Sequence, residues 1–238
     1  MGALRVVTAG TGDPLLLLHG FGLSPMTYLR TIDLLAADHR VLAPWLRCTD
    51  TVWDFDTLVD SVAATLDANQ VDRVRVVGHS FGGAIAIGLT ARHPDRVSSL
   101  LAVDCLGLSP GLREISRRAF SRGTLRLASV NVARDVLSYA ARSPRELASA
   151  AWWGFKCDLV EAAEAVRVSD VPRTVLWAED DALLPAWLGA RTAERLGSDF
   201  HVVPSDPPAI RVNHDWPYRH PALFAEHVAA TLANLPAA

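Results

Sequence analysis

A serine that stands between two glycines is the feature of this sequence that most directly predicts chemistry. The motif Gly78-His-Ser-Phe-Gly82 follows an apolar run at residues 73–77 and precedes another at residues 83–88. This pattern predicts a strand, a sharp turn and a helix, because the glycines let the turn hold Ser80 at strained backbone angles. The Ser80 hydroxyl would project above the sheet as a nucleophile at the positive end of a helix. The alternative is a plain glycine-rich turn in which Ser80 only caps the helix.

A serine hydroxyl becomes an effective nucleophile only beside a base, and the base needs a carboxylate that orients it. After a nucleophile of this type, the acid is expected first along the chain and the histidine second. The predicted strand at residues 173–177 is followed by acids at positions 179–181. His214 follows the predicted strand at residues 200–203, in a loop before the last helix. Ser80, one of these acids and His214 are therefore expected to meet at one rim of a sheet.

Short apolar runs alternate with longer amphipathic ones along the rest of the chain. This alternation predicts an α/β fold, with a doubly wound, mostly parallel sheet that carries helices on both faces. Ligands bind at the carboxyl ends of the strands in such sheets. The expected strands cover residues 4–9, 15–18, 40–43, 73–77, 99–104, 173–177 and 200–203. The expected helices cover residues 27–37, 56–68, 80–92 and 221–233.

The alternation is interrupted by residues 105–170, which contain helical patterns but no convincing strand. Ser109 and Ser143 are each followed by a proline, which is typical of a helix start. A crossover between parallel strands needs only about a dozen residues. This insertion is therefore expected to form a helical cap, with residues 1–104 and 171–238 as the core. The alternative is a set of ordinary crossover helices.

Five motifs stand at or near the predicted strand ends. They are His19-Gly-Phe-Gly22, residues 35–44, residues 78–83, residues 177–185, and His214 with Pro221. Together they resemble the α/β-hydrolase superfamily, and the resemblance covers nearly all of the chain outside the expected cap. It implies the α/β-hydrolase fold and a catalytic triad that includes Ser80 and His214.

The resemblance also indicates which acid completes the triad. The acid of this family usually stands two residues after a Gly-Glu-like pair and four residues before a proline. That position corresponds to Asp181 in this sequence. Asp180, and Asp104 after the preceding strand, are the alternatives.

The resemblance further implies an oxyanion hole formed by the backbone N–H groups of Phe21 and Phe81. Their rings are expected to line an acyl pocket, with core packing as the alternative. The sequence departs from the family at residues 45–49, where the glycines of the family's loop are absent. A loop of different shape is expected there. The chain also begins close to its first predicted strand, so the family's first edge strand is expected to be absent.

Aromatic residues are the candidates for lining a substrate pocket. The segment at residues 152–155 is the most aromatic cluster of the chain, and packing within the cap is its alternative role. The candidate pocket residues are Trp45, Trp152, Trp153, Phe155 and Trp216.

Arginines gather in the predicted cap. Arg118, Arg122 and Arg126 repeat every four residues, which would place them on one face of a helix. Further arginines nearby are Arg113, Arg117 and Arg134. Such a stripe predicts attraction of an anionic substrate or an acidic carrier protein, and a kcat/KM that falls with salt. The alternative is a solvated face.

Composition excludes several classes of protein. The chain has 238 residues, of which 50% are hydrophobic and 21% charged, so it is not a disordered protein. A net charge of −3 predicts no affinity for nucleic acid or an anionic membrane. The cysteines Cys48, Cys105 and Cys157 form no C-x-x-C pair, which favours reduced thiols and a cytoplasmic location. Signal-peptide, transmembrane, metal-site and nucleotide-binding patterns are not found in the sequence, so no cofactor or metal is expected.

These observations predict a serine hydrolase that cleaves a small carboxylic ester or lactone through an acyl-enzyme on Ser80. The alternatives with the same triad are a carbon–carbon bond hydrolase acting on a diketone and a thioesterase. A serine at position 80 argues against epoxide hydrolase and haloalkane dehalogenase activity, which need a carboxylate there. A further alternative is a non-catalytic member that only binds a ligand.

Overall fold

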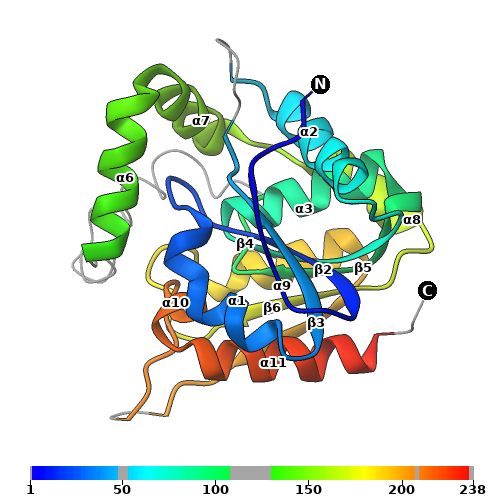
Figure 1. Cartoon of the computed structure of the whole chain (residues 1–238). Coiled ribbons are helices and arrows are strands. Elements are labelled where there is room, and N and C mark those ends of the chain that lie inside the picture. The colour runs from blue at the N-terminus through cyan, green and yellow to red at the C-terminus, as the bar shows by residue number, and fades with distance from the viewer. Residues whose placement is uncertain (1, 48–52, 108–129, 207–208, 236–238) are drawn as a thin grey trace.

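The computed structural model describes residues 2–47, 53–107, 130–206 and 209–235. In these residues one sheet of seven strands forms the centre of the molecule, in the order β1-β3-β2-β4-β5-β6-β7 (Figure 1). Neighbouring strands are parallel except β1, which pairs with β3 in the antiparallel sense at one edge. The strands are β1 (Val6–Ala9), β2 (Asp13–Leu18), β3 (His39–Pro44), β4 (Val74–His79), β5 (Val97–Val103), β6 (Arg173–Ala178) and β7 (Asp199–Val203).

Helices cover both faces of the sheet, and this explains why the inner strands are apolar throughout. The packed pairs of helices place α1, α10 and α11 on one face, and α2, α3, α8 and α9 on the other (Figure 1). The helices are α1 (Leu29–Leu35), α2 (Phe55–Ala68), α3 (Phe81–Arg92), α8 (Val160–Val168), α9 (Ala186–Leu196), α10 (Trp216–Arg219) and α11 (Pro221–Asn234). Short 3-10 turns precede α1 and β5, as η1 (Pro25–Tyr28) and η2 (Pro94–Arg96). The predicted α/β class and doubly wound, mostly parallel sheet are confirmed.

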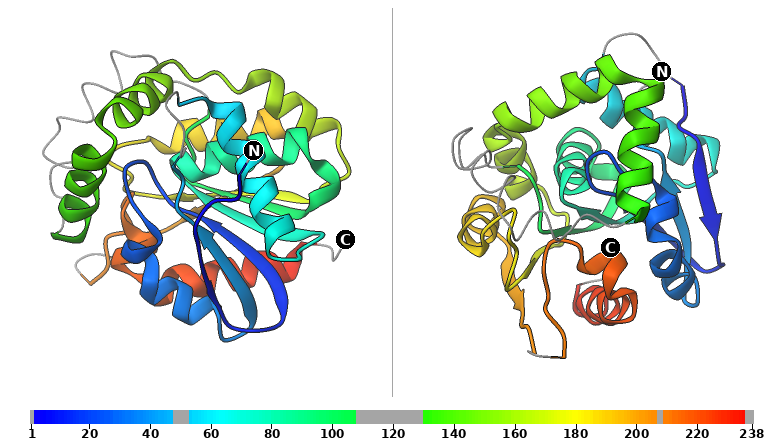
Figure 2. Two further views of the ribbon diagram at one scale, coloured as in Figure 1. Left: turned by 45° about the horizontal axis from the view of Figure 1, so that its top comes forward. Right: turned by 90° about the vertical axis from the view of Figure 1, so that its left-hand side faces the viewer.

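Two helices stand apart from these layers. They are α6 (Val130–Arg142) and α7 (Pro144–Lys156), which lie beyond the carboxyl ends of the central strands (Figures 1 and 2). The side chain of Asp135 on α6 ties this part to the core, because its Oδ2 accepts hydrogen bonds from Ser24 Oγ at 2.7 Å and Thr27 Oγ1 at 2.6 Å. The predicted helix start at Ser109 falls outside the described residues.

The predicted cap, residues 105–170, extends too far along the chain. Helix α8 packs against α3 and α9 in the layer on the sheet, and it is not part of the cap. Its Ala163 and Val166 are buried in the same apolar core as Val171. The sequence shows a helix here, but only the contacts of its apolar face decide whether it covers the sheet or the strand ends. No helix in the described parts of the chain has the length and apolarity that crossing a membrane requires.

Candidate active site

Ser80 lies at a sharp turn between β4 and α3, with φ of 56° and ψ of −118°. Glycine is needed on both sides of it because the backbone segments nearly touch. A Cβ atom on Gly82 would lie 2.2 Å from the Leu18 carbonyl oxygen, and one on Gly78 would lie 2.5 Å from the Gly82 carbonyl oxygen. The Ser80 N–H donates to the carbonyl of Val103 at 2.9 Å, which ties the turn to β5. The Ser80 side chain makes no helix-cap hydrogen bond, so its hydroxyl is not used as a plain N-cap.

The Ser80 hydroxyl instead belongs to a chain of three side chains. His214 Nε2 lies 3.0 Å from Ser80 Oγ, and His214 Nδ1 lies 2.7 Å from Asp181 Oδ2. The other oxygen of Asp181 accepts from the backbone N–H groups of Leu183 at 2.8 Å and Leu184 at 2.7 Å. Since the carboxylate accepts the Nδ1 proton, Nε2 is left to accept the proton of the serine. The structure therefore brings together the residues that the sequence predicts would meet at this rim.

The two alternative acids make other contacts. The Asp180 carboxylate accepts from Ser205 Oγ at 3.0 Å and lies 3.8 Å from Arg211 Nε. Asp104 Oδ1 accepts from the Ala178 N–H at 2.7 Å. Among the described residues, Asp181 is thus the acid that bonds to the His214 ring.

The neighbours of His214 set its basicity. Burial opposes protonation, but the charge of Asp181 and its hydrogen bond outweigh this effect and raise the pKa of His214 above its ordinary value of 6.5. The nearby His79 behaves differently. Burial and the proximity of His214 hold the pKa of His79 well below 6.5, so its ring is neutral. Only one of the two imidazoles is thus suited to accept a proton near neutral pH.

His79 belongs to a second network of buried hydrogen bonds, which lies beside the triad. Its Nε2 donates to the backbone carbonyl of His214 at 2.9 Å, which leaves Nδ1 to accept from the Tyr28 hydroxyl at 2.7 Å. The Tyr28 oxygen in turn accepts from the Gly20 N–H at 3.2 Å. The sequence gives no signal for the role of Tyr28 in this network. This network links the segment before Phe21 to the backbone of His214.

A second buried carboxyl lies beside the triad. Asp104 has φ of 42°, and its oxygens accept from the Ala178 N–H at 2.7 Å and from the Trp216 indole N–H at 2.6 Å. Burial and the charge of Asp181 raise the pKa of Asp104 to about 8. Ligand atoms of His79, Asp104 and His214 lie within 4.8 Å of one another. The ring nitrogens of both histidines already have hydrogen-bond partners.

The raised pKa of Asp104 predicts a pH dependence of stability. Between pH about 4 and about 8 the folded chain holds a proton on Asp104 that the unfolded chain has lost. The contribution of Asp104 to the free energy of unfolding is therefore largest below pH 4 and falls as pH rises to about 8. Asp104→Asn keeps the shape but cannot ionise, so we expect it to remove this slope. Urea unfolding of both proteins at pH 5 and pH 8 measures the effect, and an unchanged slope would show that folded Asp104 is ionised.

A small apolar cavity opens at Ser80. Its volume is about 160 Å³. The rings of Phe21 and Phe81 lie at its edge with centroids 5.9 Å apart in an edge-to-face arrangement. Phe81 is the first residue of α3, so its N–H has no acceptor within the helix. The lining residues other than Ser80 are Phe21, Phe81, Leu106, Ala150, Ala151, Gly154, Phe155, Leu183 and Leu184.

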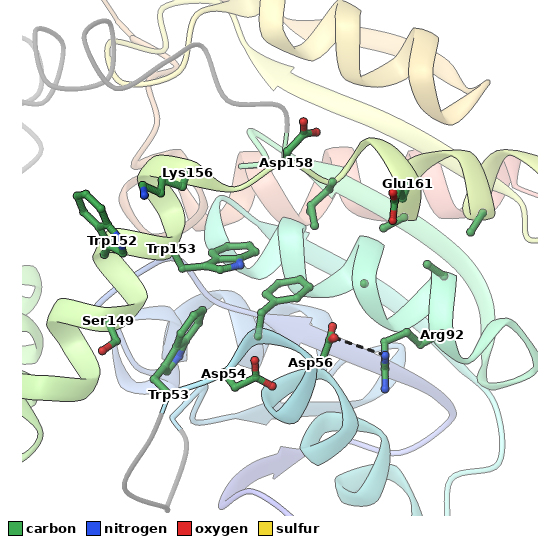
Figure 3. A pocket seen from close by; sticks show the side chains of 16 residues that line it. Trp53, Asp54, Asp56, Arg92, Ser149, Trp152, Trp153, Lys156, Asp158 and Glu161 are labelled. Atoms are coloured by element: carbon green, nitrogen blue, oxygen red, sulfur yellow. Dashed lines mark ion pairs between the residues drawn. The ribbon is translucent and has the colours of Figure 1, made fainter.

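Phe21 and Phe81 line this cavity as predicted, and of the five further candidates Trp45, Trp152, Trp153, Phe155 and Trp216, Phe155 lines it. Trp152 and Trp153 line a different and larger groove of about 760 Å³ among α2, α3, α7 and α8 (Figure 3). Trp153 stacks on Phe55 at 4.2 Å and contacts Phe81 edge-on at 5.8 Å, so it supports the pocket wall from behind. Trp152 is 56% exposed. The prediction that Trp152 and Trp153 line the pocket is therefore wrong.

Trp45 and Trp216 also lie elsewhere. Trp45 lines a third cavity, where its ring lies under the guanidinium of Arg5 at 4.3 Å. Trp216 is fully buried beneath the site, and its N–H is bound by Asp104. These residues stand near the predicted strand ends in sequence, but their side chains turn toward other partners. Small and aliphatic side chains form most of the pocket instead, and their residue types carry no signal of this role.

Comparison with known proteins identifies the family of the chain. The sequence profile of the Alpha/beta hydrolase family matches residues 15–227. The chain belongs to this family. Its membership, with esterases among its relatives, identifies the chain as an enzyme of the hydrolase type. The α/β-hydrolase resemblance predicted from the motifs is thereby confirmed.

Individual relatives of this hydrolase differ in their reactions. A 2-hydroxymuconate semialdehyde hydrolase of Pseudomonas sp. strain CF600 is 34% identical over 111 residues, which are 42% of this chain and 39% of that protein. A pimeloyl-[acyl-carrier protein] methyl ester esterase of Chromobacterium violaceum is 39% identical over 103 residues, which are 42% of this chain and 40% of that protein. The matched part of this chain thus spans about two-fifths of each of these relatives.

Solved structures of other proteins share this fold. A variant of the meta-cleavage product hydrolase from Pseudomonas fluorescens IP01 superimposes with a TM-score of 0.73 and 20% identity, over 96% of this chain and 93% of that protein. Because the sequence identity is this low, the similarity shows a shared fold only.

Proposed function

We propose that this hydrolase cleaves small carboxylic esters or lactones through an acyl-enzyme on Ser80. The hydrogen-bonded chain from Ser80 through His214 to Asp181, at the mouth of an apolar cavity, is the observation that carries this proposal. An apolar cavity beside an activated serine favours an uncharged acyl group, because burying a charge there is costly.

In this mechanism Ser80 Oγ attacks the carbonyl carbon while His214 Nε2 takes its proton. Asp181 holds the ring in the required tautomer and stabilises the imidazolium that forms. The backbone N–H groups of Phe21 and Phe81 are proposed to stabilise the negative oxygen of the tetrahedral intermediate. His214 then gives the proton to the leaving alkoxide, and the acyl group remains on Ser80. Water attacks this ester with His214 as base and releases the acid.

The volume of the cavity at Ser80 limits the size of the acyl group. A protein cavity of about 150 Å³ accommodates a benzene molecule, and this cavity is of similar size. The substrate's acyl chain is therefore expected to have roughly six carbons or fewer. Ala151→Leu would fill much of this space, so we expect kcat/KM for a hexanoate ester to fall roughly tenfold relative to an acetate ester.

The matched control for this variant is Ala148→Leu, an exposed position on the same helix. It should leave the ratio of the two kcat/KM values unchanged. 4-Nitrophenyl esters with acyl chains of two to eight carbons give the profile. An Ala151→Leu profile that superimposes on that of the wild type would show that the acyl group lies elsewhere.

Carbon–carbon bond hydrolysis is the second candidate function, because the relative from Pseudomonas sp. strain CF600 carries the name of a semialdehyde hydrolase. Turnover of esters, lactones, a thioester and a 1,5-diketone-type substrate by the same preparation separates the candidates. Esters or lactones as the best substrates by kcat/KM support the proposal. A diketone cleaved faster than any ester would replace it, and no turnover of any of them would favour a non-catalytic binding protein.

An acidic carrier protein as partner stays a prediction. Arg113, Arg117, Arg118, Arg122 and Arg126 lie outside the described residues. Arg134 is described, and its Nε lies 3.8 Å from Asp135 Oδ1.

We propose a cytoplasmic location on the basis of cysteine chemistry, since Cys105 and Cys157 are free thiols.

A further inference from the structure

A third cavity lies where the cap meets the N-terminal part of the core. Its volume is about 580 Å³, and it is bounded by the segment before β1, the segment after β3 and one face of α6. No residue that lines it also lines the cavity at Ser80. A ligand in this cavity would therefore occupy a site separate from the triad.

Arginines from three separate segments line this cavity: Arg5, Arg47 and Arg142. Aromatic rings hold two of the guanidinium groups in place. The guanidinium of Arg5 lies 4.3 Å from the centre of the Trp45 ring, and that of Arg47 lies 4.2 Å from the centre of the Tyr139 ring. Stacking of this kind fixes the plane of a guanidinium and leaves its N–H edge available to an acceptor.

One of these arginines lacks a hydrogen-bond acceptor. Arg47 Nε is buried and has no hydrogen-bond partner among the described residues. A buried donor without an acceptor is costly, and bound acceptors commonly remove the cost. Arg142 donates to Ser138 Oγ on the same helix, which turns its side chain along the face of α6 that lines the cavity.

The described residues that line this cavity carry more positive than negative charge. Asp135 is the one acid among the described residues that line it. Its carboxylate already accepts from the hydroxyls of Ser24 and Thr27 at 2.7 and 2.6 Å and lies 3.8 Å from Arg134 outside the cavity lining. Among the described lining residues, three guanidinium groups and this carboxylate leave a surplus of two positive charges.

We propose that this cavity is a binding site for a small dianion, with Arg5, Arg47 and Arg142 as its ligands. Planar guanidinium groups bind carboxylate and phosphate oxygens in pairs of parallel hydrogen bonds. A phosphate group or a dicarboxylate would match the surplus charge and supply the missing acceptor for Arg47. Because Arg142 belongs to α6 and the other two arginines belong to the core, the anion would bridge the cap to the core beside Asp135.

Binding can be measured on the full chain by titration calorimetry and by thermal unfolding. The probes are inorganic phosphate and succinate, each compared with sodium chloride at equal ionic strength. A ligand that binds only the folded state raises Tm in a saturable manner. We expect saturable heat and a rising Tm with at least one of the two dianions, and neither with chloride.

Substitution of the arginines that line the cavity tests whether they bind the dianion. Arg47→Gln and Arg142→Gln are each expected to weaken dianion binding by roughly tenfold or more, since each removes a charge-assisted pair. The matched control is Arg195→Gln, an exposed arginine on α9 away from the cavity, which should bind as the wild type does. A cooperative thermal unfolding transition shows that each variant is folded.

The outcomes decide the proposal and its ligand class. Binding of phosphate alone assigns a phosphate group as the ligand, binding of succinate alone a dicarboxylate, and binding of both any small dianion. The proposal is overturned if neither probe binds saturably, if chloride reproduces the effect, or if Arg47→Gln and Arg142→Gln bind as tightly as Arg195→Gln. None of these results depends on the activity of Ser80.

Discussion

Replacement of Ser80 by alanine is expected to lower kcat by roughly 10⁴- to 10⁶-fold, the loss typical of a triad without its nucleophile. The side chain is small and lies at a turn that glycines permit, so the variant should fold as the wild type does. What it loses is the hydroxyl oxygen that lies 3.0 Å from His214 Nε2. Steady-state hydrolysis of a short activated ester measures the loss.

A covalent probe tests the same residue without knowledge of the substrate. A fluorophosphonate phosphorus is attacked by an activated serine oxygen, fluoride leaves, and the proton passes to the histidine. Intact mass should show one adduct per wild-type chain and none on Ser80→Ala. His214→Ala should react far more slowly, because the base is missing. His201→Ala, an exposed histidine on β7, is the matched control and should label normally. Full labelling or retained turnover by Ser80→Ala would refute the mechanism.

The position of Ser80 could be predicted from sequence because its local pattern and its neighbours in the fold agree. A strand, a glycine turn and an apolar helix specify the turn itself. The parallel sheet then places everything that follows a strand at the same edge, so His214 and the acids after β6 reach the serine from distant parts of the chain. The order of the strands and the ends at which the loops begin are enough to bring these residues together, whatever the exact direction of each side chain.

Prediction failed where side-chain direction decides the outcome. The side of α7 that lines the cavity at Ser80 carries Ala150, Ala151, Gly154 and Phe155, and at about 100° per residue Trp152 and Trp153 fall on the rest of the helix surface. Trp216 follows His214 closely and yet packs inward onto Asp104. Tyr28 supports the site through His79, and a single tyrosine in a short turn gives no pattern that would reveal it. The predicted end of the cap differs from the structure for the same reason. Only tertiary contacts show that α8 packs against α3 and α9.

Replacement of Asp181 by asparagine is expected to lower kcat by roughly 10³- to 10⁴-fold while the structure is maintained. The amide oxygen can still accept from Leu183 and Leu184, but the amide nitrogen would then face His214 Nδ1. Two donors cannot bond to each other, so the ring would place its proton on Nε2. That tautomer cannot accept the proton of Ser80. Activity with a 4-nitrophenyl ester measures the loss.

Asp180→Asn is the matched control, because Asp180 is the neighbouring carboxylate and its contact is with Ser205. We expect its kcat to stay within about twofold of the wild type, as is usual for a substitution outside the reacting groups. Loss of activity in Asp180→Asn with near-normal activity in Asp181→Asn would move the acid to position 180.

The pH profile distinguishes an orienting carboxylate from a residue that only stabilises the fold. His214 acts as a base when it is neutral, and its pKa lies above the ordinary 6.5, so wild-type kcat/KM should rise with pH through a value above 6.5. Asp181 is the main cause of that raised pKa. In Asp181→Asn the residual activity should therefore reach its plateau at a lower pH than in the wild type, whereas in Asp180→Asn the profile should not move. A merely structural Asp181 would lower activity equally at every pH, because the basicity of His214 would be unchanged.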